Sequence, residues 1–557
     1  MALTLKTNEV MRQIRHLLTM AALAVMGAIM AGCASEDNII ADPQQPAGPT
    51  GPLTLTTTVT LGDGANATRA LTADGVKTFK EGDQIAVKYI RNDYGISKTD
   101  VSNALKTTDI SSDGKTATFT VTLTYTPKEG CNVTYVYPAV LGEDGSRNIM
   151  IQSDQDGTLT TLASKFDYCE GSGTMGGTAP NFVLPTGVTL KNQLTLAKFT
   201  VRDGTSDITS GVTQLMIDDG TRGYVVNRTA AAGPIWVAMY PIASTQKIKV
   251  TAVKGAAVYQ SNDITGKTLA KNNYYDITVT TRQIDMSTVS DAYLKQPLTF
   301  EAKEDDTKVK FTLAPCVKKP VEYSTFDGTN WTTWTTYTSD TEISLASKGD
   351  KVMFRGNNAA YSAGGDNSTF SVTDGGCYVY GNVMSLVNAT VFPVVKTLTA
   401  NDAFRCLFQG CGGIHSLDSK KIVLPATTLT KGCYDNMFCF CPNLTTAPAL
   451  PATTLTESCY ANMFSGCWNL TTAPDLPATT LTRNCYFDMF SDCTKLNYVK
   501  CLATDISADN CTGAWLDGVS GSGTFIINKG LDKDYPAPWT RGIDGIPDGW
   551  TVEKATE

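Results

Sequence analysis

The 557-residue sequence contains only two histidines, His16 and His415. Because His16 lies in the amino-terminal leader, a single histidine remains for the rest of the chain, which excludes a zinc site built on paired histidines. A Ser-His-Asp triad could form only around His415, and its surroundings, CGGIHSLDS, contain no nucleophile motif. We therefore predict that His415 is a loop residue between repeats.

Charged residues are also scarce. They make up 18% of the chain, against about 25% in ordinary soluble proteins. The net charge is -8 and no run of basic residues occurs. A mildly acidic surface of this kind excludes the usual electrostatic footprint of a nucleic-acid-binding protein.

Motifs for catalysis, cofactors and metals are missing or incomplete. Residues 171–176 match G-x-G-x-x-G, but no helix follows to present its amino terminus to a phosphate, so a glycine-rich loop is expected. Residues 154–157 (DQDG) form half of a calcium loop and lack the later carboxylate. No catalytic residue, cofactor or metal ligand is predicted, and the chain is not expected to be an enzyme.

The amino terminus has the pattern of an export signal. Arg12 and Arg15 precede an apolar run at 17–30, which is followed by Ala31-Gly32-Cys33. The run is too short to span a bilayer comfortably. Ending in A-G-C, residues 1–32 resemble a bacterial lipoprotein signal peptide, which implies lipidation of Cys33. The alternative is an ordinary signal peptide with an incidental cysteine.

Residues 33–52 are predicted to be a proline-rich tether. Ser35, Glu36 and Asp37 resemble the acidic signal that sends some lipoproteins to the outer face of the outer membrane. The stretch DPQQPAGPTGP at 42–52 cannot pack a core and should be extended. We therefore expect a surface-exposed protein that is lipid-anchored to the cell outer membrane.

Residues 53–283 alternate polar and apolar residues with a period of two, which indicates an all-β sandwich or a pair of sandwiches. This part of the chain, together with the lipoprotein motif Ala31-Gly32-Cys33, resembles the fimbrillin-like, type V pilin-related surface proteins. The resemblance is carried by that motif, by Thr68-Arg69-Ala70, by the segment FKEGD at 79–83 and by the closing segment at 266–280. This resemblance implies that Arg69 is a site of proteolytic processing. The alternative is a surface arginine in a turn.

In that family, subunits polymerise by donating a terminal strand to the next subunit. Here residues 284–557 follow the β-rich region, so the fimbrillin-like part has no free tail to donate. The resemblance therefore favours a pilus tip or accessory subunit, or an unpolymerised surface protein, over a stalk subunit.

Residues 295–395 are predicted to form a small β-sandwich module, because short β-type runs alternate with turn signals such as Asp327-Gly328. Trp331, Trp334 and Tyr337 follow that turn. Aromatic rings on a hairpin can stack on sugars, which makes these three residues candidates for ligand binding. The alternative is that the rings cover a small core.

From Leu424 to Cys501 the chain repeats three times at a period of 26 residues, and the first two units agree at 19 of 26 positions. Such a repeat predicts a stacked solenoid. The spacing of Cys459, Met463 and Cys467 predicts a short helix with one buried face, followed by a strand. The motif M-F-x-x-C-x-x-L resembles the BspA-type leucine-rich repeat. The predicted solenoid covers 396–516, and residues 517–557 are predicted to form a carboxy-terminal capping tail.

The repeat places equivalent residues in a structural ladder. Its members are Cys433, Cys459, Cys485, Cys441, Cys467, Cys493, Met437, Met463, Met489, Phe438, Phe464 and Phe490. The cysteines recur 8 and 26 residues apart, unlike the close pairs of zinc sites. They are predicted to be small buried thiols, with disulfides as the alternative.

Together these features predict a mainly β fold: fimbrillin-like β-sandwiches, a small β-sandwich module, and a short leucine-rich-repeat solenoid with short helical turns. The predicted function is adhesion or ligand recognition at the cell surface. The partners would be the outer membrane through the lipid anchor, a host or neighbouring-cell surface protein or glycan, and other fimbrial subunits. A pilus tip or accessory subunit is the structural alternative, and a glycan-handling enzyme the third.

Overall fold

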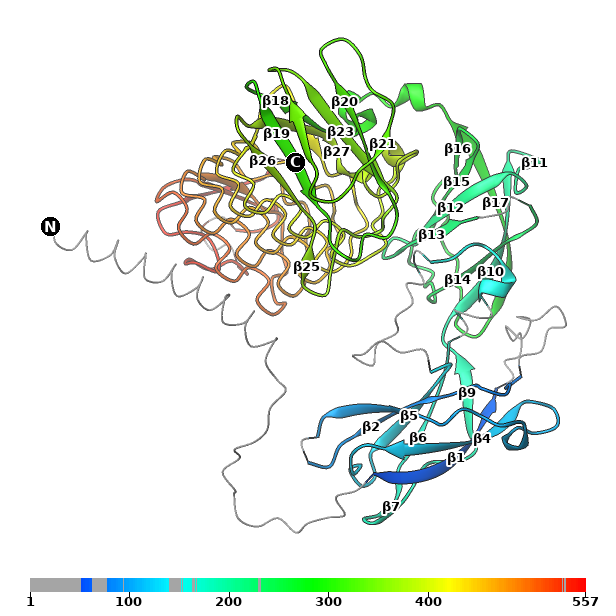
Figure 1. The fold of residues 1–557 in the computed structure, drawn as a ribbon. Coiled ribbons are helices and arrows are strands. Elements are labelled where there is room, and N and C mark those ends of the chain that lie inside the picture. The colour runs from blue at the N-terminus through cyan, green and yellow to red at the C-terminus, as the bar shows by residue number, and fades with distance from the viewer. Residues whose placement is uncertain are drawn as a thin grey trace. The chain divides into compact units, whose positions relative to one another are not determined.

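The computed structural model describes residues 52–62, 78–93, 95–139, 152, 154–162, 166, 168–228, 232–532, 534 and 537–556. The leader, the tether up to residue 51, Cys33 and Arg69 lie outside these residues. Strands dominate the described chain, and its α-helices are only three and four residues long, at Leu159–Thr161 (α2) and Ala292–Lys295 (α3) (Figure 1). Within the described ranges no helix has the length and apolarity needed to cross a membrane.

The first sheet has the strand order β3-β2-β5-β6-β9-β1-β4. Strand β1 (Leu53–Leu61) pairs with β4 (Thr116–Leu123) antiparallel along its length and with β9 (Val188–Asn192) in parallel at its end. Its alternation places Val59 and Leu61 in the core. On the other face Thr58 and Thr60 bond to threonines of β4. The remaining strands are β2 (Ala86–Ile90), β3 (Ser97–Val101), β5 (Asn132–Tyr137) and β6 (Cys169–Thr174).

The prediction of a glycine-rich loop at 171–176 is wrong. Most of this segment lies in strand β6, which pairs with β5 and β9. A side chain at Gly171 would place Cβ 2.6 Å from the carbonyl oxygen of Thr189. Glycine is therefore needed for the close approach of β9, and not for phosphate binding.

The second sheet contains β10 (Thr195–Asp203) beside β17 (Tyr274–Ile284), which pair in parallel over eight residues. The full order is β11-β10-β17-β16-β15-β12-β13, with β14 (Ile235–Met239) paired to β10. The other strands are β11 (Ser206–Asp207), β12 (Val212–Asp218), β13 (Gly223–Asn227), β15 (Lys249–Lys254) and β16 (Ala257–Gln260).

A segment that precedes the second sheet in sequence is built into it. The amide of Asn227 in β13 donates to the carbonyl of Gln155, and the amide of Trp236 in β14 donates to the carbonyl of Gly157. The side-chain amide of Gln155 makes two 2.8 Å bonds to the main chain of Ala238. Because Gln155 lies between β5 and β6 of the first sheet, the chain visits the second sheet before the first is complete.

The module that follows consists of two facing sheets. One has the order β21-β20-β23-β18-β27-β28 and the other β22-β19-β26. The first contains β18 (Leu298–Ala302), β20 (Val321–Phe326), β21 (Thr335–Thr336), β23 (Lys351–Gly356), β27 (Cys377–Asn382) and β28 (Ile414–His415). The second contains β19 (Thr307–Thr312), β22 (Glu342–Leu345) and β26 (Thr369–Thr373).

The core of the module is aromatic. Phe311 and Phe370 stack 3.7 Å apart, and Phe300 and Phe354 pack around them. Strand β27 also pairs in parallel with β28 and with β29 (Ile422–Val423), which belong to the beginning of the repeat region. The module and the repeats therefore share one continuous hydrophobic core, and no break in the core separates residues 295–395 from residues 396–516.

The repeat units form stacked coils, but the predicted short helix is wrong. Residues 431–440 form consecutive hydrogen-bonded turns, in which Asn436 and Phe440 have φ of 57°. An α-helix requires negative φ and bonds from residue i to residue i−4. Here the amide of Met437 donates to Tyr434 three residues back, whereas the amide of Phe438 donates to Met463 in the next coil. Of the strands predicted at the ends of the units, only the third forms, as β30 (Tyr498–Lys500), and the second is reduced to an isolated bridge between Thr472 and Tyr498.

Beyond the third coil the ladder continues as a parallel sheet of β30, β31 (Thr524–Ile527) and β32 (Thr551–Lys554). The rings of Trp515 and Trp539 stack 5.5 Å apart at this end of the core. Trp550 is also buried, and its indole nitrogen donates to the carbonyl oxygen of Ser520. Indole groups therefore fill the interior at the carboxy-terminal end of the coils.

Candidate functional site

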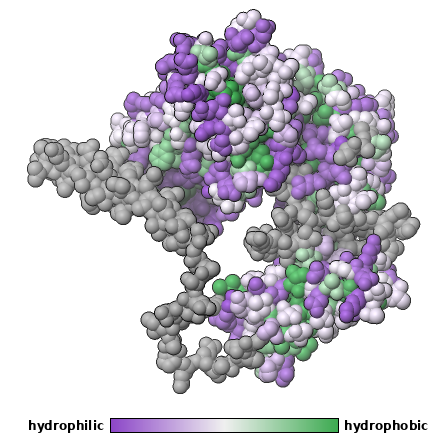
Figure 2. Space-filling model, viewed as in Figure 1, coloured by the Kyte–Doolittle hydropathy of each residue, from purple (hydrophilic) through white to green (hydrophobic). Residues whose placement is uncertain are grey.

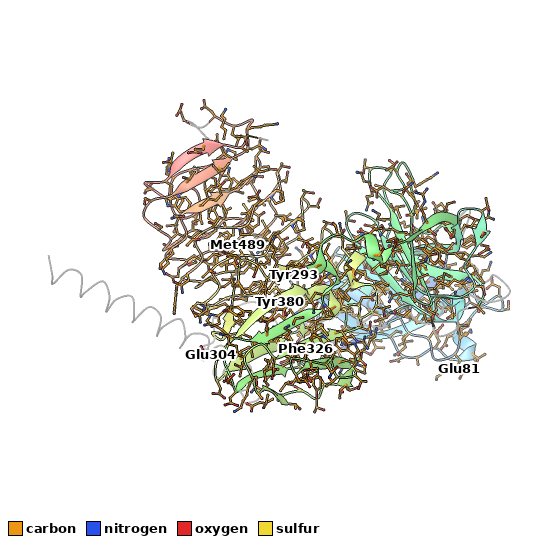
Figure 3. All side chains as sticks on the ribbon, turned by 90° about the horizontal axis from the view of Figure 1, so that it is seen from above. Glu81, Tyr293, Glu304, Phe326, Tyr380 and Met489 are labelled. Atoms are coloured by element: carbon orange, nitrogen blue, oxygen red, sulfur yellow. The ribbon has the colours of Figure 1, made fainter. Side chains whose placement is uncertain are left out.

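The interior of the coils is built from two columns of stacked aromatic rings. In one column Phe438, Phe464 and Phe490 follow one another at 5.6 Å, with 2° and 5° between ring planes. The column begins at Phe370 of the module, which stacks on Phe408. The second column runs through Phe404, Tyr434, Tyr460, Tyr486, Trp515 and Trp539. The methionine sites of the ladder, including Met489 (Figure 3), lie fully buried beside these rings.

Main-chain bonds hold the coils at this spacing. Alternate amides of the turn segment donate to the next coil, from Tyr434 to the carbonyl of Cys459 and from Phe438 to that of Met463. The amides between them donate three residues back within their own coil. This division of donors explains why the turns cannot be a helix, and it makes the coils a rigid support for side chains on their outer surface.

The ladder cysteines are buried thiols in this structure. The Sγ atoms of the second cysteine column each lie about 3 Å from a main-chain carbonyl oxygen of the preceding coil. The pairs are Cys441 with Phe408, Cys467 with Phe438, and Cys493 with Phe464. Burial raises the pKa of the Cys467 thiol to about 12. All fifteen cysteines of the described ranges are free thiols, and only Cys316 is partly exposed. Such thiols are packing groups and not nucleophiles.

The outer positions of the coils differ from unit to unit. Lys431, Glu457, Arg483 and Asp509 occupy equivalent places, and charge alternates down this column. Lys431 contacts Glu457 at 3.1 Å and Arg483 contacts Asp509 at 3.6 Å. These pairs are exposed and stabilise little.

Two large apolar side chains of the coils point into solvent, and the sequence analysis missed both. Phe440 is 48% exposed and Trp468 is 50% exposed. A signal for them was present, because each stands where the other units have smaller or polar residues: glycine and aspartate opposite Phe440, proline and threonine opposite Trp468. The repeat departs from its own pattern at these two positions.

The three predicted stacking residues of the module are not one platform. Tyr337 is buried, and its hydroxyl bonds to main-chain groups of Phe311 and Thr341, so its proposed ligand contact is wrong. The guanidinium of Arg355 covers the ring of Trp334 at 4.1 Å. Only Trp331 is largely exposed, at 41%, and its ring packs against Phe326 (labelled in Figure 3).

A compact ionic and aromatic cluster lies where the module meets the first coil. Lys420 pairs with Glu301, which also accepts a bond from the Tyr380 hydroxyl at 2.9 Å. The rings of Tyr293 and Tyr380 meet edge to face at 5.9 Å (Figure 3). A cavity of about 500 Å³ opens nearby, lined mainly by apolar residues and prolines such as Leu424, Pro448 and Pro451. The cluster satisfies its own charges and is best explained as structural.

His415 lies in the short strand β28, and not in a loop as predicted. Burial lowers its pKa, and the nearby charge of Lys303 acts in the same direction. Within the described ranges, no group of three or more histidine, cysteine or acidic side chains is arranged to hold a metal ion.

No family model matches the chain, and no curated protein matches it. Its structure is similar to a fimbrial assembly protein from Parabacteroides distasonis, at 12% identity and a TM-score of 0.24, covering 41% of this chain and 90% of that one. A putative cell adhesion protein from Bacteroides ovatus gives 12% identity and 0.24, covering 42% and 97%. A streptococcal ancillary pilin gives 9% and 0.17, covering 58% and 96%.

Proposed function

We propose that this chain is an exported surface protein that acts in adhesion or ligand recognition through the outer surface of its repeat coils. The observation that carries the proposal is the contrast between the inside and the outside of the coils. Buried positions such as Met437, Met463 and Met489 keep the same residue in successive units, whereas some outer positions change, from Lys431 to Glu457 and from Pro442 to the exposed Trp468. A repeated interior with an exterior that varies at some positions is expected of a stacked binding surface.

The coils resemble BspA-type leucine-rich repeats in sequence, and the proposal extends that resemblance to their role. The shared core with the module supports it, because a binding surface needs a rigid base. Figure 2 shows a mainly hydrophilic described surface in that view, with apolar residues scattered over it. The export signal and the Cys33 anchor, both inferred from the sequence, would place this surface outside the cell.

The experiment that tests the proposal uses beads coated with the purified full chain. We expect the beads to bind epithelial cells or mucin-coated surfaces better than beads coated with an unrelated protein. An antibody fragment raised against residues 424–501 should block the binding, while one raised against residues 116–137 should not. Beads that bind no better than the control would refute the proposal.

A second role, as a tip or accessory subunit of a pilus, is favoured by one feature of the first sheet. Strand β1 lies between β4 and β9, so its removal would leave a groove flanked by two strands. The resemblance to fimbrillin-like proteins implies such a removal after Arg69. Mass spectrometry of protein recovered from intact cells tests this role, and an uncut amino-terminal region together with the absence of the chain from purified fibres would exclude it.

A further inference from the structure

A groove of about 830 Å³ lies between the second sheet and the beginning of the repeat region, within the compact unit of residues 51–557. One wall is the face of β12, β15 and β16 that is turned away from the core of that sheet, and it presents Met216, Thr251 and Gln260. The opposite wall consists of residues between 387 and 399 and of threonines from the first two repeat units. The volume falls in the range of roughly 300 to 1,000 Å³ that is usual for ligand sites.

Side-chain hydrogen bonds join the two walls. The carboxylate of Asp218 in β12 accepts a bond from the hydroxyl of Thr397 at 2.6 Å and from that of Thr428 at 3.0 Å. The side-chain amide of the buried Asn388 donates to the side-chain oxygen of Gln214 at 2.8 Å. These bonds fix the separation of the walls at two places.

Close packing joins the walls as well. Val253 and Val258 of the second sheet belong to the hydrophobic core that the module and the coils share. A side chain at Gly223 in β13 would place Cβ 2.0 Å from Cγ2 of Thr397, so glycine is needed for this approach. The groove is therefore formed before any ligand arrives, as most binding sites are.

The groove carries positive charge although the chain as a whole has a net charge of -8. Its titratable lining consists of Lys247, Lys249, Lys319, Lys396, Asp218, Asp263 and the buried Tyr224. Lys249 pairs with Asp263 at 3.5 Å. Among the described residues, the exposed ammonium groups of the other three lysines have no acidic group within ion-pair distance. An anionic ligand would supply the missing partners.

The main chain of the walls offers little to an acidic peptide. Strands β12, β15 and β16 are interior strands of their sheet. The edge of β13 is occupied, because the amides of Val225 and Asn227 donate to the carbonyls of Gln152 and Gln155. On the other wall, the carbonyl of Lys396 accepts bonds from two amides of the first repeat unit. An extended peptide binds a sheet by pairing with a free edge, and neither wall presents one.

Uncharged hydrogen-bonding groups make up much of the remaining lining. They include the exposed hydroxyls of Thr453 and Thr454 and the side-chain amides of Gln260 and Asn357. Hydroxyl and amide groups both donate and accept, as the hydroxyls of a sugar do. Tyr224 is the only aromatic residue of the lining and it is fully buried. Recognition here would therefore depend on charge and hydrogen bonds, and not on ring stacking.

We propose that this groove binds an acidic glycan. Its carboxylate groups pair with Lys247, Lys319 and Lys396, and its hydroxyls bond to the threonine and amide side chains of the lining. The inference rests on the proposed recognition function of the coils and adds the ligand class and a site that the second sheet and the coils form together. The bonds of Asp218 to the coils thereby hold both halves of one site in place.

Glutamine substitutions at the three unpaired lysines test the site with little risk to folding, because these side chains are exposed and hold no acid. The groove variant combines Lys247→Gln, Lys319→Gln and Lys396→Gln. The probe is a fluorescently labelled trimer of galacturonic acid, which carries one carboxylate on each ring. Fluorescence anisotropy follows its binding to the purified full chain, and melting temperatures show whether each variant is folded.

The control variant combines Lys128→Gln, Lys191→Gln and Lys529→Gln, which are exposed lysines outside the groove, so that it lowers the net charge by the same amount. We expect the trimer to bind the wild-type chain, and the groove variant to bind it about tenfold more weakly. The control variant should stay within about twofold of the wild type. No binding to the wild type, or an equal loss in both variants, would overturn the site.

The threonines separate glycan recognition from simple attraction of an anion. Thr453→Val with Thr454→Val removes two hydroxyls of the lining without changing charge, and Thr479→Val with Thr480→Val makes the same change in the next unit, outside the groove. We expect the first pair to weaken binding about threefold and the second pair to leave it unchanged. Equal binding by the two pairs, or competition by triglutamate as strong as that by unlabelled trimer, would overturn the glycan assignment.

These measurements also separate the groove from the broader function. If the coated beads adhered to cells but the trimer did not bind the chain, adhesion would stand and the groove assignment would fall. If the trimer bound but the beads did not adhere, the groove would stand and the adhesive role would fall.

Discussion

The rings of Tyr434 and Tyr460 stack 5.8 Å apart with 5° between their planes, and neither hydroxyl has a hydrogen-bond partner among the described residues. Burial raises the pKa of both phenols well above the ordinary value. The rings therefore stabilise the coils as hydrocarbon surfaces, while each hydroxyl is buried without a protein hydrogen-bond partner among the described residues.

Removing these hydroxyls should stabilise the protein. We expect Tyr460→Phe to raise the free energy of unfolding by about 1 kcal/mol, because a buried unpaired hydroxyl carries a desolvation cost. Urea denaturation measures the change. Tyr361→Phe is the control, since the Tyr361 hydroxyl donates to the carbonyl of Leu386 at 2.9 Å and its loss should destabilise. Equal destabilisation by both substitutions would contradict the unpaired state of the Tyr460 hydroxyl.

The ladder thiols should resist alkylation in the folded protein. Burial raises the pKa of Cys433, Cys467 and Cys485 to about 12, so almost no thiolate is present at pH 8. We expect iodoacetamide to label Cys316, which is partly exposed, well before any ladder cysteine. Peptide mapping by mass spectrometry gives the order, and denaturation in urea should make all sites react. Rapid labelling of Cys467 in the native state would show that the coils open.

The carboxyl group of Asp488 should make stability depend on pH. Burial, together with the carboxylates of Asp517, Asp492 and Asp544, raises its pKa to about 6. A raised pKa means that the folded state holds this proton more tightly than the unfolded state does. The resulting stability is fully present below the ordinary pKa near 4 and is lost as the pH rises through about 6.

Asp488→Asn should therefore stabilise the protein at pH 7.5 and have little effect at pH 4. After discounting for solvent screening of a half-buried group, the gain at pH 7.5 is about 1 kcal/mol. Thermal melts at the two pH values measure it. Asp505→Asn serves as a control, because hydrogen bonds from Ser507 lower the pKa of Asp505. A stabilisation of the same size at both pH values would show that charge is not the cause.

A side chain at Gly466 should destabilise the protein. Its φ is 71°, and an added Cβ would press on the ring of Phe440 at 2.5 Å. We expect Gly466→Ala to cost about 1 to 2 kcal/mol and to change the exposure of Phe440. Gly412→Ala is the matched control, since a Cβ there meets nothing within 4 Å. Urea melts that give equal stability for the two variants would argue against the close contact.

The lipid anchor is open to a direct test, although Cys33 lies outside the described residues. Radiolabelled palmitate should enter the wild-type chain made in a bacterium with lipoprotein processing, and Cys33→Ala should abolish the incorporation. Cys316→Ala is the control and should incorporate label normally. Label that survives Cys33→Ala would remove the anchor from the proposed function.

Regular alternation made the first strands predictable. The alternation that predicted a β-rich region from residue 53 begins at β1 (Leu53–Leu61), in which one strand face is buried and the other carries threonines. The helix expected at 459–467 failed for a physical reason. A spacing of four and eight residues also fits turns whose alternate amides bond to the next coil. Periodicity shows which side chains are buried, but it does not show where the main-chain donors go.

The candidate surface was only partly predictable. Burial of Tyr337 depends on Phe311, which lies in another strand of the module, and the pattern around Asp327-Gly328 carries no information about that contact. The shared core likewise depends on Phe370 and Phe408 meeting across a segment with no repeat. In contrast, the exposure of Phe440 and Trp468 could have been inferred by comparing each unit with its neighbours.

Each coil contacts the next through the same two stacked rings and the same row of main-chain hydrogen bonds. An in-frame gene duplication of one unit would therefore insert a further turn without altering either end of the array. The length of the array, and thus the area of its outer surface, is therefore set by the number of units and not by the sequence at either end.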